Sequence, residues 1–198
     1  TLSAFKKALD HGVGIETDFR DGKNELEIKH NPYQKGGMSA DHVFQELSLH
    51  PNFRKGWFAL NVKSDGLQEE MATLIKKYKL QNNSFVFDMS GPSHYLFVRV
   101  LPPQNIATRW SDFEMPILLE KSNYVWVDQM DKEWFSEGSM RNPKMHGKTL
   151  CFVSSEIHGR DPNYLWNILN RRFSKSSEKA LLCTDWIENA QEYFFSSL

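Results

Sequence analysis

The stretch that decides the fold reads Gly14-Ile15-Glu16-Thr17-Asp18-Phe19-Arg20-Asp21. The run is strand-like, and because successive strand side chains point to opposite faces, Glu16 and Asp18 share one face. Two carboxylates on one face repel each other unless a cation, a proton or an arginine lies between them. A solvated pair on a surface strand is the alternative. His30 follows after a short charged turn, so the same end of the strand offers two carboxylates and an imidazole. This combination favours a metal site.

The composition is that of an ordinary globular protein. The chain has 198 residues, 40% of them hydrophobic, which is enough for one large domain or two small ones with a substantial core. A net charge of -1 gives no attraction to nucleic acid or acidic membranes. No apolar segment approaches the roughly 18 residues of a membrane span, so we expect a soluble protein without an integral membrane segment. Cys151 and Cys183 lie in apolar runs and indicate core residues in a reducing, cytoplasmic compartment, although their pairing stays open. The oligomeric state is not determined by the sequence.

Extended and helical segments alternate along the whole chain. Strands are expected at residues 13–19, 57–63, 84–89, 106–110, 125–128, 149–154 and 180–184. Helices are expected near 1–9, 39–50, 67–78, 93–100, 133–140, 161–173 and 187–195, the first capped by Thr1 or Ser3 and the sixth by Asp161. This rhythm predicts a parallel sheet covered by helices, in a single domain over residues 1–198.

Seven strands fit either an open doubly wound sheet or a barrel. No glycine-rich phosphate loop follows the first strand, which argues against a dinucleotide-binding fold. Polar residues end strand after strand, and in a barrel such residues form the active face. The alternative is that strands simply give way to polar loops. Because the pattern recurs at all seven strands, we predict an α/β fold of the TIM-barrel type.

The opening of the chain resembles that of the glycerophosphodiester phosphodiesterases, within the larger superfamily of phosphatidylinositol-phospholipase-C-like phosphodiesterases. The resemblance rests on residues 1–5 and on the stretch quoted above, in which Glu16 and Asp18 match a Glu-x-Asp pair. His30-Asn31 stands at nearly the spacing of a family His-Asp, and Asn61-Val62-Lys63 matches a Glu-x-Lys at the end of the next strand. Thr184-Asp185 matches a Thr-Asp that commonly ends the last strand.

The resemblance implies a distorted TIM barrel that hydrolyses a phosphodiester with a divalent cation, Mg²⁺ or Ca²⁺. On this interpretation Glu16, Asp18 and, more weakly, Asn61 hold the cation. Lys63 adds a positive charge beside the phosphate and contributes to catalysis. His30 is the general acid for the leaving alkoxide, since imidazole gains and loses protons near neutral pH.

The sequence departs from the family pattern at three places. The family begins with a strand ending in His-Arg-Gly, whereas this sequence starts at Thr1 without that strand, so we expect the first barrel strand to be missing from this chain. Asn61 replaces an acidic ligand, and an uncharged amide oxygen should bind a hard cation more weakly. Asn31 replaces an aspartate after His30, which should matter less.

Five further residues at predicted strand ends are candidate substrate contacts. Arg109 could bind phosphate, or else form an ion pair with a nearby carboxylate. A buried Asp128 would need a partner, and Arg109 is the candidate. Glu156 and His158 lie in a polar loop and could contact substrate or cap the following helix. Trp186 could stack on a ring, with core packing as the alternative.

The sequence therefore predicts a metal-dependent phosphodiesterase acting on a small-molecule glycerophosphodiester or a related sugar or polyol phosphate ester. One alternative is a non-catalytic barrel that binds a phosphate ligand after losing part of the catalytic set. A second is a carbohydrate-active barrel with paired carboxylates such as Glu16 and Glu156.

Overall fold

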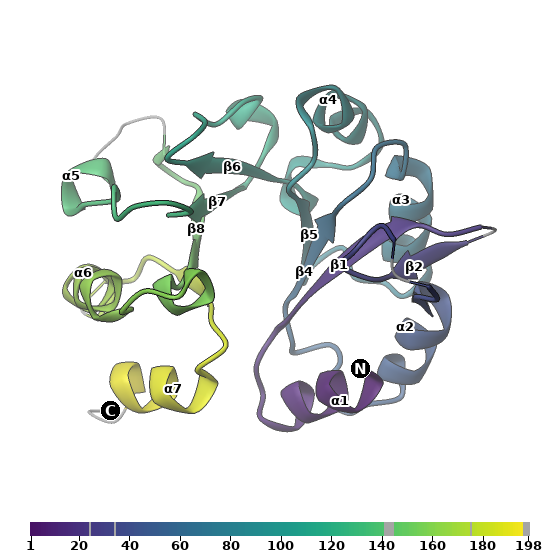
Figure 1. Ribbon diagram of the computed structural model, residues 1–198, viewed down its shortest axis with the longest axis horizontal. Helices are drawn as coiled ribbons and strands as arrows, with labels where there is room; N and C mark the ends of the chain where they lie inside the picture. Colours follow the sequence, from purple (N-terminus) through teal and green to yellow (C-terminus); the bar gives the residue numbers. More distant parts are fainter. Residues whose placement is uncertain (24, 34, 141–144, 175, 196–198) are drawn as a thin grey trace. The chain divides into compact units, whose positions relative to one another are not determined.

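The computed structural model describes residues 1–23, 25–33, 35–140, 145–174 and 176–195 (Figure 1). The chain forms two compact units. Unit 1 comprises Thr1–Ala107 with Glu120–Ser122, and unit 2 comprises Thr108–Leu119 with Asn123–Leu198. The single domain over residues 1–198 stays a prediction.

Unit 1 is built on a five-stranded sheet in the order β3-β2-β1-β4-β5. Its strands are β1 (Ile15–Asp21), β2 (Leu26–Ile28), β3 (Met38–Ser39), β4 (Phe58–Val62) and β5 (Ser84–Phe87). The expected parallel strands β1, β4 and β5 pair in parallel, whereas β2 and β3, which the sequence did not predict, add on antiparallel. Gly22 makes the β1–β2 turn tight, because a Cβ there would lie 2.5 Å from the Glu25 carbonyl oxygen.

Three of the four α-helices described in unit 1 begin at a short polar side chain that caps them. The helices are α1 (Leu2–Asp10), α2 (Ala40–Ser48), α3 (Gln68–Lys77) and α4 (Gly91–Val100), with the short 3₁₀ turns η1 (Pro103–Asn105) and η2 (Leu119–Lys121) nearby in the chain. The side chains of Thr1, Ser39 and Ser90 each accept a hydrogen bond from the backbone of the first turn of α1, α2 and α4, whereas α3 begins after Leu67 without such a cap. The predicted cap at Thr1 is thereby confirmed.

Phe44 of α2 lies in the centre of the unit 1 core and is 1% exposed. Its ring centroid lies 5.6 Å from that of Phe58, 5.9 Å from Tyr78, 6.2 Å from Phe19 and 6.4 Å from Phe53. Burying a phenylalanine side chain contributes roughly 1.5–3 kcal/mol. The packing holds α2 against the face of β1 opposite to Glu16 and Asp18, because Phe19 and Glu16 lie on opposite faces of that strand.

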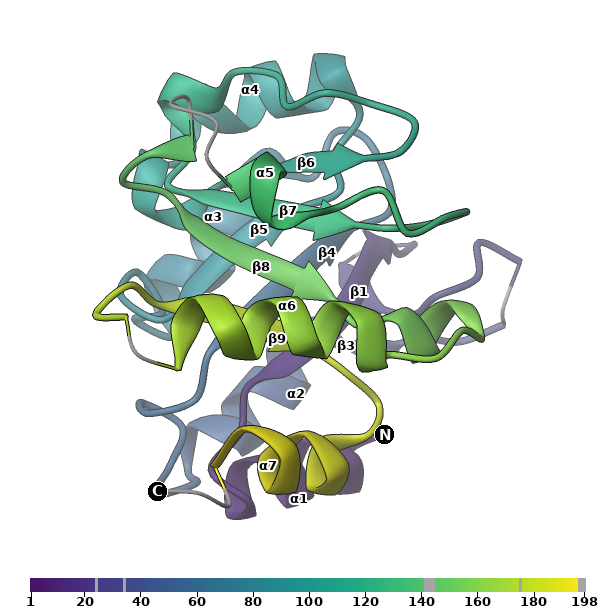
Figure 2. The ribbon, with the colours of Figure 1, turned by 90° about the vertical axis from the view of Figure 1, so that its left-hand side faces the viewer.

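Unit 2 is built on a four-stranded sheet in the order β6-β7-β8-β9. Its strands are β6 (Ala107–Ser111), β7 (Tyr124–Asp128), β8 (Thr149–Val153) and β9 (Ala180–Cys183), of which β7, β8 and β9 pair in parallel. The helical segments are α5 (Glu137–Met140), the 3₁₀ turn η4 (Ser155–His158), α6 (Asn163–Phe173) and α7 (Ile187–Phe195). Figure 2 shows α6 in front of the strands of this sheet. Leu165 and Leu169 of α6 belong to one apolar cluster with Val127 and Phe152 of the sheet.

Two helix boundaries in unit 2 differ from the prediction. α5 starts at Glu137 and not at residue 133. α6 starts at Asn163 with Pro162 at its N-cap, so Asp161 is not the cap residue; its Oδ1 still accepts a hydrogen bond from the Asn163 N–H, at 2.9 Å. Proline has no side-chain acceptor, so the preceding aspartate accepts the hydrogen bond from the Asn163 N–H, which has no partner within the helix.

The predicted α/β class with parallel strands is confirmed. Both cysteines are free thiols, and burial raises the pKa of Cys151 well above its usual range. Among the described residues, every helix is too short or too polar to cross a bilayer.

Candidate functional site

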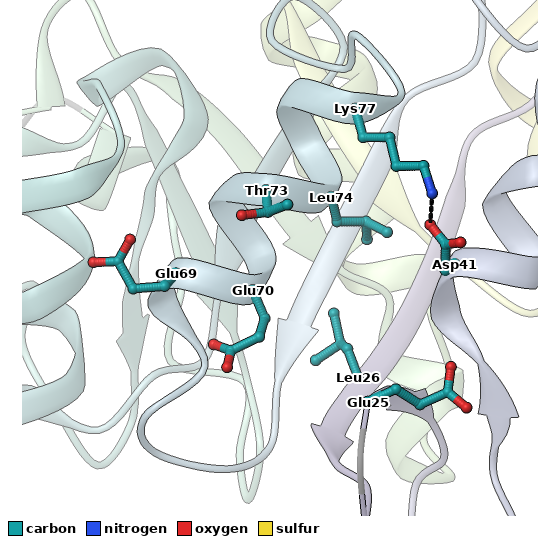
Figure 3. Close-up of a pocket in the computed structure, with 8 residues that line it drawn as sticks. All are labelled: Glu25, Leu26, Asp41, Glu69, Glu70, Thr73, Leu74 and Lys77. Atoms are coloured by element: carbon teal, nitrogen blue, oxygen red, sulfur yellow. Dashed lines mark hydrogen bonds and ion pairs between the residues drawn. The ribbon is translucent and has the colours of Figure 1, made fainter.

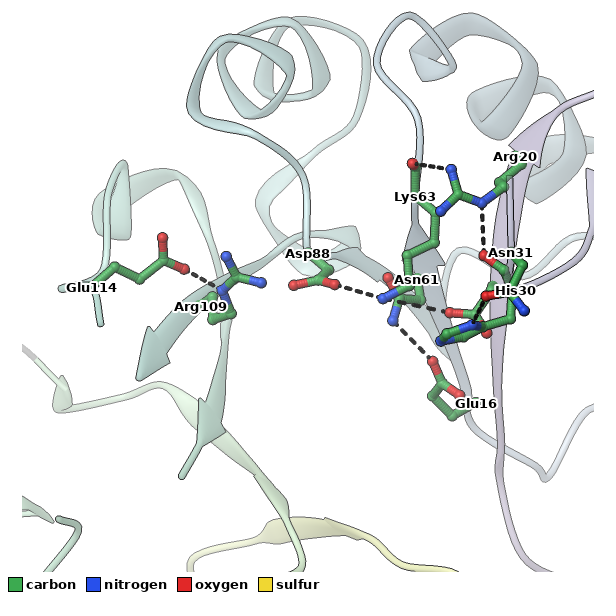
Figure 4. A network of polar contacts seen from close by, with 10 residues as sticks. Glu16, Arg20, His30, Asn31, Asn61, Lys63, Asp88, Arg109 and Glu114 are labelled. Atoms are coloured by element: carbon green, nitrogen blue, oxygen red, sulfur yellow. Dashed lines mark hydrogen bonds and ion pairs between the residues drawn. The ribbon is translucent and has the colours of Figure 1, made fainter. Parts of the chain in front are cut away.

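The carboxylates of β1 share one face of the strand, as the spacing predicts. Ile15, Thr17 and Phe19 are buried on one side, while Glu16 and Asp18 are half-buried on the other. The parallel register pairs Asp18 with Asn61 of β4, which brings the end of that strand beside them. The Asn61 Nδ2 donates to Glu16 Oε1 at 3.2 Å (Figure 4). The first part of the predicted set is thus assembled at the carboxyl ends of β1 and β4.

The ammonium group of Lys63, just after β4, forms ion pairs with two carboxylates. Its Nζ lies 3.6 Å from Asp18 Oδ1 and 2.9 Å from Asp88 Oδ2. Asp88 follows β5 and has a φ of +70°, a conformation that non-glycine residues seldom adopt and that is found at functional sites more often than elsewhere. Asp88 was not among the predicted site residues, although its position at a strand end was a signal that could have found it.

The Arg20 side chain links the backbone of His30, which follows β2, to the backbone of Lys63, which follows β4. Its Nε donates to the His30 carbonyl at 2.8 Å, and its Nη1 donates to the Lys63 carbonyl, also at 2.8 Å. The His30 side chain is exposed, with Nδ1 3.0 Å from Asn31 Oδ1. Since an amide oxygen only accepts, Nδ1 carries the proton in this contact and Nε2 is left facing away from Asn31. Figure 4 shows Arg20 with its two hydrogen bonds, to the backbone of His30 and to that of Lys63.

The site carries an excess of negative charge. Glu16, Asp18 and Asp88 are three carboxylates, and Lys63 is the ammonium among them. Burial raises the pKa of Glu16 from 4.5 to about 7, and repulsion from Asp18 adds to the effect; the hydrogen bond from Asn61 and the charge of Lys63 oppose it. A carboxyl held in this way has a high affinity for a proton or a cation.

Three side chains of the site carry oxygen atoms that could bind a divalent cation. Among the described residues, no group of three or more His, Cys, Asp or Glu side chains is arranged to hold a metal ion. The candidate set, however, has two carboxylates and one amide, and Asn61 Oδ1 is buried without a hydrogen-bond partner. Carboxylate and amide oxygens are the ligands that Mg²⁺ and Ca²⁺ prefer. The side-chain oxygens of Glu16, Asp18 and Asn61 are therefore of the chemical kinds that a hard cation takes.

The remaining predicted site residues lie in unit 2. Asp128, at the end of β7, is 7% exposed, and its Oδ1 lies 2.7 Å from His158 Nε2. The Arg109 Nε donates to Glu114, the ion pair that was the alternative to phosphate binding, and the pairing of Arg109 with Asp128 stays a prediction. Glu156 Oε1 accepts from the Thr184 hydroxyl and from the Asp185 N–H at 3.1 Å. Trp186 is 48% exposed, so the core-packing alternative is wrong for this residue.

A separate groove of about 360 Å³ lies on unit 1 (Figure 3). Leu26 and Leu74 line it together with the acidic side chains of Glu25, Asp41, Glu69 and Glu70, and Lys77 pairs with Asp41. None of the predicted site residues lines this groove. We therefore assign it no part in the chemistry of the candidate site.

Comparison with known proteins gives a likeness of fold. No protein-family model and no curated protein sequence matches this chain. A crystal structure of a glycerophosphodiester phosphodiesterase from Parabacteroides distasonis matches with a TM-score of 0.66 and 14% identity, over 100% of this chain and 90% of that one. A candidate glycerophosphoryl diester phosphodiesterase from Silicibacter pomeroyi matches with a TM-score of 0.67 and 12% identity, over 100% of this chain and 88% of that one. At these identities the comparison establishes the fold, and the activity has to be argued from the site.

Proposed function

We propose that this protein hydrolyses a phosphodiester, specifically a glycerophosphodiester or a related sugar or polyol phosphate ester. One observation carries the proposal: Glu16, Asp18, Asn61 and Lys63 meet at the carboxyl ends of β1 and β4. The fold supports it, because both structures named above are of glycerophosphodiester phosphodiesterases or candidates for that activity.

Glu16, Asp18 and Asn61 would hold Mg²⁺ or Ca²⁺ through their side-chain oxygens. When bound, such a cation neutralises phosphate oxygens and lowers the pKa of an attacking hydroxyl. The protein's own part is to keep three oxygens together against their repulsion. The contact of Asn61 with Glu16 and that of Lys63 with Asp18 serve this purpose.

Lys63 and His30 supply the rest of the chemistry on unit 1. Lys63 places a positive charge where negative charge develops on the phosphoryl oxygens, which stabilises the transition state. His30 donates from Nδ1 to Asn31, and in its doubly protonated form it would present Nε2–H as the general acid that protonates the leaving alkoxide. Arg20 holds the backbone of both residues through its two hydrogen bonds to carbonyl groups.

On unit 2, Arg109, Asp128, Glu156, His158 and Trp186 are proposed substrate contacts. Arg109 could bind a phosphate oxygen through its guanidinium group, whose Nε donates to Glu114. Trp186, half-exposed after β9, offers an aromatic face to a polyol or a ring.

A second candidate function is phosphate binding without turnover. The observation that favours it is Asn61, an uncharged amide where a third carboxylate would strengthen cation binding. Lys63 also neutralises Asp18 and Asp88 in part, which lowers the attraction for a cation. The two functions differ in one measurable respect, namely release of an alcohol from a diester.

The test is hydrolysis of bis(p-nitrophenyl) phosphate and of glycerophosphocholine by the full-length protein, with Mg²⁺, Ca²⁺ or EDTA. We expect cation-dependent turnover that His30→Ala lowers about a hundredfold or more. His42→Ala is the matched control, because His42 is also an exposed histidine of unit 1 but lies on α2. Turnover that is unaffected by EDTA or by His30→Ala would refute the mechanism. Binding of glycerol phosphate without turnover would instead establish the second function.

A further inference from the structure

The ammonium group of Lys63 has one short and one longer contact with carboxylates, both within unit 1. It donates a hydrogen bond to Asp88 Oδ2 at 2.9 Å, whereas Asp18 Oδ1 lies 3.6 Å away, beyond hydrogen-bonding distance (Figure 4). The three side chains are partly buried to a similar degree, with 24% of Lys63, 16% of Asp88 and 19% of Asp18 exposed. Because solvent screens the two pairs to a similar extent, the shorter distance decides that Lys63 is bound mainly by Asp88.

The backbone of Lys63 is held separately from its side chain. Its N–H donates to the Phe19 carbonyl at 2.9 Å, and its carbonyl accepts from Arg20 Nη1 at 2.8 Å, so residues of β1 fix the chain where it leaves β4. A lysine side chain is a flexible four-carbon stem, which can place its ammonium at many positions from one backbone position. The contact with Asp88 selects one of these positions, at the carboxyl end of β5.

The contact between Lys63 and Asp88 is not needed to join the two loops that carry these residues. The Ser90 hydroxyl donates to Asp65 Oδ1 at 2.7 Å, which already connects the loop after β5 to the loop after β4. Asp88 itself has a φ of +70°, a left-handed conformation that glycine adopts at lower cost. An aspartate at such a position indicates a use for its carboxylate, and Lys63 is a partner of that carboxylate.

We propose that Asp88 is a positioning residue, which holds the Lys63 ammonium beside the cation ligands and away from Asp18. The inference rests on the proposed function and adds a residue to its site. Without Asp88, Asp18 is the carboxylate left to Lys63 among its described contacts, and an ammonium bound there would occupy an oxygen that is proposed to bind the cation. With Asp88, Lys63 keeps a carboxylate partner when the cation binds Asp18, and its positive charge stays in the site to stabilise the phosphoryl group.

The sign of one effect separates this role from a simple effect of charge. A carboxylate near a phosphate repels it, so if Asp88 acted through its charge alone, Asp88→Asn would strengthen the binding of a phosphate anion. If Asp88 positions Lys63, the same substitution weakens that binding. Asparagine is the suitable replacement, because it keeps the size of the side chain and also tolerates the left-handed backbone conformation.

The measurement is calorimetric titration of the full-length protein with glycerol 3-phosphate in saturating Mg²⁺, together with kcat for a diester that the wild type hydrolyses. We expect Asp88→Asn to raise Kd and to lower kcat about tenfold or more, with an unfolding midpoint close to that of the wild type. Lys63→Met should be affected at least as much, and adding Asp88→Asn to it should weaken binding no further, because Asp88 acts through Lys63. Asp65→Asn is the matched control: it removes the same charge from the same pair of loops, its described partner is Ser90, and it should leave Kd and kcat unchanged.

The outcomes distinguish the inference from the function on which it rests. If Asp88→Asn binds glycerol 3-phosphate as tightly as the wild type or more tightly, the inference is refuted while the proposed function stands. The inference is also refuted if Asp88→Asn weakens binding equally in the wild type and in the Lys63→Met protein. If the wild type neither binds glycerol 3-phosphate nor releases an alcohol from a diester, the proposed function fails and the inference fails with it.

Discussion

Replacing Glu16 by glutamine should stabilise the metal-free protein above neutral pH. The Glu16 carboxyl has a pKa of about 7 in the folded protein, against an ordinary value of 4.5, because burial and the nearby Asp18 disfavour its charge. The folded state therefore binds the proton more tightly than the unfolded state. The free energy of unfolding falls as pH rises from about 4.5 to 7, and the loss is complete above that window. At about 1.4 kcal/mol per pH unit, the full cost is about 3 kcal/mol.

Glu16→Gln removes the charge and keeps an oxygen that can accept from Asn61. We expect urea unfolding in EDTA at pH 8 to show a free energy of unfolding up to about 3 kcal/mol above that of the wild type. At pH 4.5 the two proteins should differ by less than about 1 kcal/mol, because Glu16 is then mostly protonated. Glu133→Gln, in an exposed segment, is the control and should change little at either pH.

Added Mg²⁺ or Ca²⁺ should make the wild type more stable than Glu16→Gln at pH 8. The wild type gains stability because the cation binds the folded state, and Glu16→Gln gains much less after losing a charged ligand. Below pH 7 the cation competes with a proton on Glu16, so the apparent affinity of the wild type should fall with decreasing pH. Equal stabilities of the two proteins at pH 8, or an advantage of the variant that is the same at pH 4.5, would refute the electrostatic account of the site.

Three further outcomes follow from the structure. Phe44→Ala should lose about 3–5 kcal/mol of unfolding free energy in urea, because it empties the centre of the unit 1 core; a loss below 1 kcal/mol would contradict that packing. Burial lowers the pKa of His94 below its usual 6.5, so its contribution to stability is present above pH 6.5 and is lost as pH falls below it. When the pH is lowered from 7 to 5.5, the free energy of unfolding should fall less for His94→Gln than for the wild type. If the free energies of the two proteins fall in parallel, His94 has no such role. Arg20→Ala should lower turnover about tenfold or more while costing only about 1–2 kcal/mol in stability, because it frees the backbone of His30 and Lys63; unchanged turnover would show that the hairpin needs no such support.

Local signals predicted most of the regular elements. The cap at Thr1, the apolar stripes of the long helices and the runs of β4 to β9 depend on residues within one or two turns of each other. The strands β2 and β3 were missed because segments of three and two residues carry no periodic pattern, and they form only by pairing onto β1. The helix start at Asp161 was misplaced by two residues, a distance over which caps cannot be told apart from sequence.

The site was predicted in part for the same reason. Glu16 and Asp18 share a face through strand geometry alone, and Asn61 and Lys63 were found through the motif that they match. Asp88 joined them only when the parallel register brought the end of β5 to Lys63. The pairing of Asp128 with His158 joins residues 30 positions apart, and no local pattern in the sequence indicates it.

The sequence by itself determined the alternation of strands and helices and the placement of polar residues where strands end, because these follow from side-chain periodicity and capping along the chain. Tertiary structure alone decided the chemistry of those residues. Burial beside Asp18 changed Glu16 from an ordinary carboxylate into one with a pKa near neutrality. Folding brought His158 to the buried Asp128 and engaged its Nε2. Charge and proton affinity depend on desolvation and on neighbours within a few ångströms, and those neighbours come from distant parts of the chain.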